Sequence, residues 1–298
     1  MAETAESTPA GFREPRTKII GGTLYQSSTV PYAYVASCHV LGNGQVEALI
    51  SPKYSWHEHS PLSPLALADY DQCILNPVQR TPYEQEQEDI RNRVRATRRA
   101  RTKVRRLCKH RGLIEILTLT YRENMQDRER MARDLDVFIK RIRRVIPAFQ
   151  YVAVFEKQKR GAWHAHLAVE RVLPVYWKNK TLVKSFDLLR SMWRGVVGVD
   201  NGNIDVSKRH RRRWSPAKIA GYISKYIGKN FGENLKYENS YSASGAPLPK
   251  PIRFTFPTLF EGISGVFALL TVELRGAEIF TKLLPGSGFW LSAAPRPK

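Results

Sequence analysis

The chain is organised around the stretch Glu156-Lys-Gln-Lys-Arg-Gly-Ala-Trp-His-Ala-His-Leu-Ala-Val-Glu170. Just before it, Tyr151-Val-Ala-Val-Phe155 alternates like a strand, and near its end Leu167-Ala-Val169 does the same. Between the two runs, Lys159-Arg-Gly161 supplies a turn. Two strand-like runs joined by a short turn with glycine are typical of a β-hairpin, and the sequence therefore predicts one here.

Two histidines and one carboxylate are expected on a single face of this hairpin. His164 and His166 are separated by one residue, and residues i and i+2 of a strand point to the same side. Folding about the turn places Glu156 nearly opposite them. Such a mixed set leaves open positions for water and a phosphate oxygen, which suits Mg²⁺ or Mn²⁺ better than a closed structural zinc site. The alternative is a polar patch on a half-solvated strand.

A second stretch, Ser215-Pro-Ala-Lys-Ile-Ala-Gly-Tyr-Ile-Ser-Lys-Tyr-Ile-Gly-Lys229, predicts a short helix. It begins with a good N-cap and a proline, and isoleucines recur every fourth residue as a stripe to be buried. These isoleucines are Ile219, Ile223 and Ile227. Tyr222 and Tyr226 are also four residues apart, so their phenols share one face, with Lys225 close by. Ordinary amphipathic packing is the alternative explanation of the tyrosine pair.

Together these elements resemble the HUH endonucleases, and most closely the two-tyrosine rolling-circle replication initiators of small phages and plasmids. The resemblance rests on His164-Ala-His166 with Glu156 upstream, followed by Tyr222-Ile-Ser-Lys-Tyr226. A third element agrees, because Ile116-Leu-Thr-Leu-Thr-Tyr121 looks like the first motif of those initiators, an apolar strand ending in Thr. All three occur in the order of the family, and the resemblance covers residues 113–232.

The resemblance implies a metal-dependent, site-specific DNA endonuclease that is also a strand transferase. The two histidines and the glutamate would hold Mg²⁺ or Mn²⁺. Tyr222 would attack single-stranded origin DNA first, giving a 5′-phosphotyrosine and a free 3′-hydroxyl that a polymerase can extend. Tyr226 would act in the later strand transfer that closes the circle. Lys225 would lie near the scissile phosphate, or else be a solvated helix residue.

A formal net charge of +21 over 298 residues points to a polyanionic partner. The segment Pro82–Arg111 begins acidic and ends basic, an order that suits the helix dipole and predicts a long helix. Its uncompensated cations favour contact with DNA, and an ordinary solvated face is the alternative. Further cations lie at the hairpin turn and in Lys208–Arg213. The arginines expected to contact DNA are Arg91, Arg95, Arg98, Arg99, Arg105, Arg106, Arg160, Arg211, Arg212 and Arg213.

The elements predicted in residues 113–235 follow the order strand, helix, strand, strand, helix, strand, helix. This order predicts the α+β class, with an antiparallel sheet and flanking helices. The resemblance implies a ferredoxin-like or RRM-like core for this endonuclease domain. Around it we expect a disordered tail at residues 1–17, an N-terminal region at 18–112 that ends in the basic helix, and C-terminal strands within 236–298.

The C-terminal strands are expected at Ile252–Phe256 and Gly265–Arg275, either completing the catalytic sheet or forming a small separate unit. His57 and His59 form a second His-x-His pair. No apolar alternation flanks this pair, and a loop is therefore predicted there.

Several classes of protein are disfavoured by features that the sequence lacks. No run of about 18 apolar residues and no signal peptide is present, so no membrane partner is expected. Three cysteines without paired spacing indicate a reducing compartment, here the cytoplasm of a bacterial host. No G-x-x-x-x-G-K-S/T loop occurs, and unwinding would therefore require a helicase of the host.

Two other functions compete with the initiator. A single-strand transposase or a conjugative relaxase would use the same metal and tyrosines. Transposases similar to this arrangement usually carry a cysteine-rich zinc segment, however, and relaxases generally place the tyrosine near the N-terminus and use three histidines. The non-enzymatic alternative is a basic DNA- or RNA-binding regulator, which predicts salt-sensitive binding without metal dependence or a covalent product.

Overall fold

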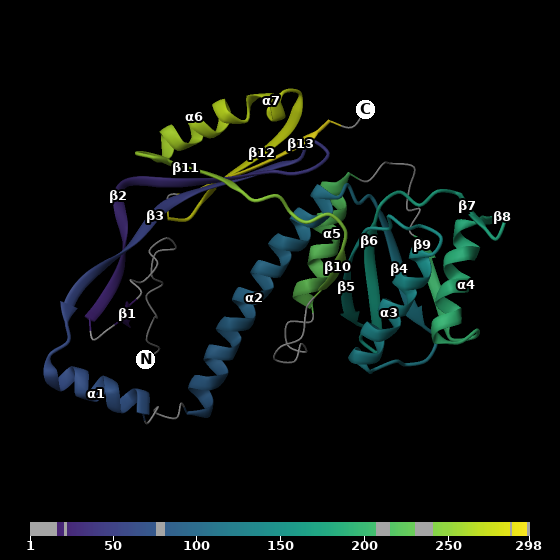
Figure 1. The fold of residues 1–298 in the computed structure, drawn as a ribbon, viewed down its shortest axis with the longest axis horizontal. Helices are drawn as coiled ribbons and strands as arrows, with labels where there is room; N and C mark the ends of the chain where they lie inside the picture. Colours follow the sequence, from purple (N-terminus) through teal and green to yellow (C-terminus); the bar gives the residue numbers. More distant parts are fainter. Residues whose placement is uncertain are drawn as a thin grey trace, which may run out of the picture. The chain divides into compact units, whose positions relative to one another are not determined.

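The computed structural model describes residues 17–20, 23–75, 81–206, 215–229, 241–286 and 288–296 (Figure 1). The chain divides into two compact units. The terminal unit contains Met1–Val40, Gly44–Glu86 and Pro249–Arg296, and the central unit consists mainly of Gln87–Leu248. Helices and antiparallel strands occur in both, which confirms the predicted α+β class. None of the helices in the described residues combines the length and the apolar character needed to cross a membrane.

The terminal unit is a six-stranded antiparallel sheet with short helices. Its strands are β1 (Thr17–Ile20), β2 (Thr23–Val40), β3 (Val46–Pro61), β11 (Ile252–Phe256), β12 (Ala277–Leu284) and β13 (Gly288–Pro295). Their order is β1-β2-β3-β13-β12, and β11 also pairs with β2. The helices are α1 (Pro64–Leu75), α6 (Leu259–Leu269) and α7 (Thr271–Leu274). Helices α6 and α7 lie along one face of this sheet (Figure 1), where Val266 and Leu270 pack against Ile50 and Leu291.

Two sequence predictions for this unit are wrong. The loop predicted around His57 and His59 is part of strand β3, where His57 pairs with Gln26 of β2. The strand predicted at Gly265–Arg275 is helical, because it lies within α6 and α7. Its buried residues Val266, Leu270 and Leu274 recur every four positions, which is the period of a helix.

The central unit contains a five-stranded antiparallel sheet of order β10-β5-β6-β4-β9. Its strands are β4 (Glu115–Tyr121), β5 (Tyr151–Lys157), β6 (Trp163–Val169), β9 (Gly202–Val206) and β10 (Tyr241–Ser244). A small hairpin, β7 (Val175–Lys178) and β8 (Thr181–Lys184), stands apart from this sheet. The helices are α2 (Pro82–His110), α3 (Arg128–Arg143), α4 (Ser185–Val197) and α5 (Pro216–Lys229). The predicted order of elements is confirmed, with β7 and β8 as additions.

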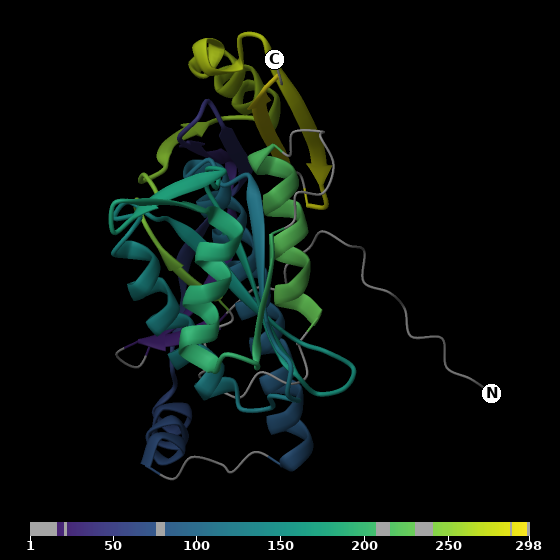
Figure 2. The same ribbon diagram turned by 90° about the vertical axis from the view of Figure 1, so that its right-hand side faces the viewer.

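The two faces of this sheet are covered by different helices (Figure 2). On one face, α3 and α4 bury Phe138 and Trp193 against Leu117 and Leu119 of β4. On the other face, the predicted isoleucine stripe of α5 packs on β5 and β6, and the last turns of α2 join it through Val104 and Leu107. Strands covered on both faces are apolar nearly throughout, which explains the continuous apolar runs of β5 and β6.

The C-terminal segment, for which the sequence left two arrangements open, contributes to both units. Strand β10 pairs with the edge of β5 in the central sheet. Strands β11, β12 and β13 instead pair within the terminal sheet, next to β2 and β3. The basic helix also crosses the expected boundary at residue 112, because its last turns belong to the core of the central unit.

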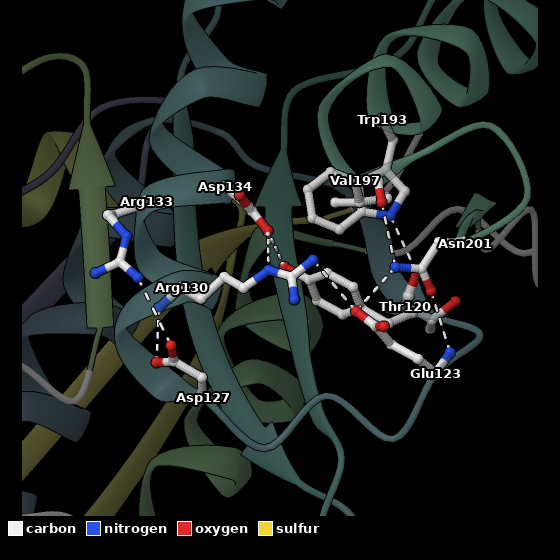
Figure 3. Close-up of polar contacts among 10 residues, drawn as sticks. Thr120, Glu123, Asp127, Arg130, Arg133, Asp134, Trp193, Val197 and Asn201 are labelled. Atoms are coloured by element: carbon white, nitrogen blue, oxygen red, sulfur yellow. Dashed lines mark hydrogen bonds and ion pairs between the residues drawn. The ribbon is translucent and has the colours of Figure 1, made fainter.

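A polar network holds the end of strand β4 (Figure 3). The indole N–H of Trp193 donates to the carbonyl of Thr120 over 3.0 Å, and Arg130 pairs with Glu123 at 3.3 Å and with Asp134 at 3.7 Å. The amide of Asn201 donates to the carboxylate of Glu123 over 2.9 Å. These contacts tie β4 to α3, α4 and the loop before β9, and so fix the strand that neighbours the histidine hairpin.

Candidate functional site

The histidine hairpin forms as predicted, with β5 and β6 in antiparallel register. Glu156 lies opposite His164, and Val154 lies opposite His166. His164 and His166 project on the face covered by α5, and their exposed fractions are only 8% and 6%. Both imidazoles are therefore nearly removed from solvent beneath the tyrosine helix.

His166 lies at the centre of a row of hydrogen bonds across three strands. Its Nε2 atom lies 2.7 Å from Oε2 of Glu156, on β5. Its Nδ1 atom lies 3.2 Å from the hydroxyl of Thr118, on β4. With the Nε2–H donating to the carboxylate, Nδ1 accepts from the threonine hydroxyl. A metal on Nε2 requires the opposite tautomer, with Nδ1–H donating to Thr118, and a hydroxyl serves both arrangements.

His164 keeps one ring nitrogen without a hydrogen-bond partner. Its Nδ1 atom lies 3.0 Å from the side-chain amide of Gln158, whereas its Nε2 atom is buried and makes no hydrogen bond. Burial lowers the pKa of His164 to about 4, and the neighbouring His166 and Arg160 lower it further while Glu156 opposes them. The imidazole is therefore neutral at pH 7, the form in which a histidine binds a metal.

The two tyrosines of α5 lie directly against this pair of histidines. The ring of Tyr226 stacks on that of His166, with 4.2 Å between centroids and 16° between planes. Tyr222 meets Tyr226 edge to face at 5.3 Å, and the hydroxyl of Tyr226 donates to that of Tyr222 over 2.6 Å. Lys225, on the same helix, is exposed. Two motifs separated by about sixty residues in sequence thus form one site.

The side chains present fit a divalent cation by type, but they contact one another as they stand. Within the described ranges, no three His, Cys, Asp or Glu side chains are arranged around a common cation position. Glu156 and Nε2 of His166 are bonded to each other, so a cation would have to replace that bond. The unpartnered Nε2 atom of His164 is a buried donor of the kind that a metal satisfies. Metal binding stays a prediction.

The arginines predicted to contact DNA differ in their accessibility. Arg91, Arg95, Arg98 and Arg99 of α2, together with Arg160 at the hairpin turn, are exposed. Arg105 and Arg106 are half-buried, on the part of α2 that packs into the core. Arg91 pairs with Glu88 at 3.0 Å, and Arg160 donates to the carbonyl of Tyr121 over 3.4 Å. Arg211, Arg212 and Arg213 lie outside the described residues.

Three polar residues of this site were not singled out by sequence reasoning. Thr118 and Gln158 contact the imidazoles, and Asp205 of β9 lies opposite Thr118 on the same face of the sheet. Thr118 lies inside the first motif, but only the pairing of β4 with β6 shows that it faces His166. Trp163, considered as a base-stacking residue, is instead buried in the core beneath α3. Trp214 lies outside the described residues.

Comparison with known proteins agrees with the order of the motifs. A search of curated proteins and a search of solved structures each gave no match. Residues 114–231, less than half of the chain, match the family model of the replication-associated protein ORF2. The matched segment runs from β4 to the tyrosine helix and includes every side chain of the candidate site. This part of the chain is therefore similar to a family of replication-associated proteins, which is consistent with a replication initiator.

Proposed function

We propose that this protein initiates rolling-circle replication by nicking single-stranded origin DNA through a tyrosine nucleophile. One observation carries the proposal: Tyr226 stacks on His166 while its hydroxyl lies 2.6 Å from that of Tyr222. A buried imidazole pair and two phenols, brought together from distant parts of the sequence, are the groups that phosphodiester transfer through tyrosine requires. The match to replication-associated proteins agrees with this chemistry.

In the proposed first step, Oη of Tyr222 attacks the scissile phosphorus. The bond from phosphorus to the 3′ oxygen breaks, and that oxygen takes up a proton. The products are a 5′-phosphotyrosine and a free 3′-hydroxyl, which a host polymerase extends once a host helicase has opened the duplex. The phosphodiester bond energy is kept in the phosphotyrosine, so no nucleotide cofactor is needed for religation.

Each side chain of the site has a task in this scheme. A free tyrosine has a pKa of about 10, so it needs help to react as a phenolate. The hydrogen bond donated by Tyr226 stabilises the developing charge on Tyr222. Glu156, His164 and His166 would hold Mg²⁺ or Mn²⁺, which supplies charge withdrawal at a non-bridging phosphate oxygen. Lys225 is placed to contact the phosphate.

The second tyrosine gives the scheme its turnover. Tyr226 lies one helical turn from Tyr222, so it can attack a regenerated origin while Tyr222 still carries DNA. The 3′-hydroxyl released by that second attack then displaces Tyr222 from its phosphate and closes the circle. The exposed arginines of α2 would hold the DNA through its phosphates.

The experiment is to mix the protein with single-stranded origin DNA, with and without Mn²⁺, and to resolve denatured adducts on a gel. We expect a metal-dependent covalent adduct that Tyr222→Phe removes. Tyr241→Phe is the matched control, since Tyr241 packs on the same core cluster as both nucleophile candidates and contributes no phenol to the site. An undiminished adduct in Tyr222→Phe would overturn the assignment of the nucleophile.

A second variant separates metal chemistry from DNA binding. Replacing both His164 and His166 by Ala is expected to abolish cleavage while leaving DNA affinity nearly unchanged. Cleavage that survives this change would remove the metal site from the proposal. Absence of an adduct in the wild type, with DNA binding intact, would favour the non-enzymatic regulator instead.

A further inference from the structure

Strand β12 forms one end of the six-stranded sheet in the terminal unit. It pairs with β13 on one side, and no other described strand pairs with its outer edge. Every residue from Glu278 to Leu283 is exposed, and the exposed fractions reach 55% for Phe280 and 70% for Leu283. A long exposed edge with apolar side chains is a template for another strand, because its outward N–H and C=O groups lack partners in the sheet.

The sequence of this edge, Ala277-Glu-Ile-Phe-Thr-Lys-Leu-Leu284, is complementary to itself in the antiparallel direction. A twofold axis through Phe280 places Glu278 of one copy opposite Lys282 of the other, and the reverse pair follows by symmetry. Phe280 then meets Phe280 between two ion pairs on one face of the sheet. On the other face, Ile279 meets Thr281, and Ala277 meets Leu283. Opposite charges and apolar pairs directly across two strands are the combinations that stabilise a sheet.

Neighbouring registers lack this complementarity. An axis through Ile279 or Thr281 places Glu278 opposite an apolar side chain. An axis through Glu278 or Lys282 brings like charges together, which destabilises the pair. The single acidic and single basic residue of β12 therefore select one register, and they do so only for a partner of the same sequence.

We propose that β12 pairs with β12 of a second copy of this chain, joining the two terminal sheets into one continuous antiparallel sheet. The pairing is isologous, because the same strand acts on both sides of the twofold axis. Both copies then carry α6 and α7 on the same face of the joined sheet, since a twofold axis perpendicular to a sheet preserves its faces. This dimer is independent of the nicking chemistry.

Sedimentation velocity of nuclease-treated protein tests the register by charge exchange. The wild type is expected to show a concentration-dependent dimer. Glu278→Lys and Lys282→Glu each place like charges opposite one another twice, and each is expected to weaken the dimer by roughly tenfold or more. An equimolar mixture of the two variants restores both opposite-charge pairs in a heterodimer, and the double variant restores them in a homodimer.

Recovery of the dimer in the mixture and in the double variant would establish the pairing, since neither change adds apolar surface. The proposal fails if the wild type sediments as a monomer throughout, if the single variants dimerise as the wild type does, or if the mixture remains monomeric. Far-UV circular dichroism and thermal unfolding should be unchanged in every variant, because Glu278 and Lys282 are exposed. Adduct formation with origin DNA, measured on the same variants, is expected to persist.

Discussion

The buried, neutral state of His164 predicts how the stability of the central unit depends on pH. The unfolded chain protonates this imidazole near pH 6.5, whereas the folded protein does so only near pH 4. Between these values the unfolded state binds more protons, and acidification therefore favours unfolding. A difference of about 2.5 pKa units corresponds to about 3 kcal/mol. This stability is fully present above pH 6.5 and is lost as the pH falls to 4.

The measurement is guanidinium unfolding, followed by tryptophan fluorescence from pH 7.5 to pH 4 in the presence of a chelator. His164→Asn is the reference, because its amide can keep the contact with Gln158 but does not titrate. Both proteins share every other titrating group, and the difference between their pH profiles therefore isolates His164. We expect the wild type to lose up to about 3 kcal/mol more than the variant over this range. Parallel profiles would refute the reasoning.

Three further outcomes are expected. Ile223→Ala leaves a cavity between α5 and the sheet, so denaturant unfolding should show a loss of about 2–5 kcal/mol; a loss near zero would contradict the packing of α5. Thr118→Val should weaken Mn²⁺ binding, measured by electron paramagnetic resonance, by about 10–100-fold, whereas Thr120→Val, whose hydroxyl bonds to a backbone carbonyl, should not; equal effects would exclude a special role for Thr118. Replacing four exposed arginines of α2 by Gln should weaken binding of every DNA sequence and flatten its salt dependence by about 0.9 in log–log slope per lost phosphate contact, and an unchanged slope would argue against this interface. These arginines are Arg91, Arg95, Arg98 and Arg99.

Elements encoded by local periodicity could be predicted from the sequence. The hairpin follows from two alternating runs and a turn, and the register of Glu156 with His164 follows from the position of that turn. Helix α5 follows from its cap and from isoleucines every fourth residue. Such patterns act between near neighbours, so their outcome depends little on the rest of the chain.

Other elements form only through partners that are distant in sequence. Strand β3 continues through His57 and His59 because β2 supplies its backbone partners, although its side chains show no apolar alternation. Residues 265–275 contain apolar residues that fit a strand or a helix, and packing against Ile50 and Leu291 selects the helix. Trp163 belongs to the core because α3 covers it, and the sequence cannot show that cover.

By itself the sequence determined the residue types of the site, the strand face that carries both histidines and the helix face that carries both tyrosines, since each depends on a period of two or of about four residues. Only the tertiary structure decided that Tyr226 stacks on His166, that Thr118 reaches the same imidazole, and that three C-terminal strands join the terminal sheet. The physical reason is that these contacts join segments whose separation in sequence carries no periodic signal. They form because buried surface and paired backbone groups are optimised over the whole fold rather than within one element.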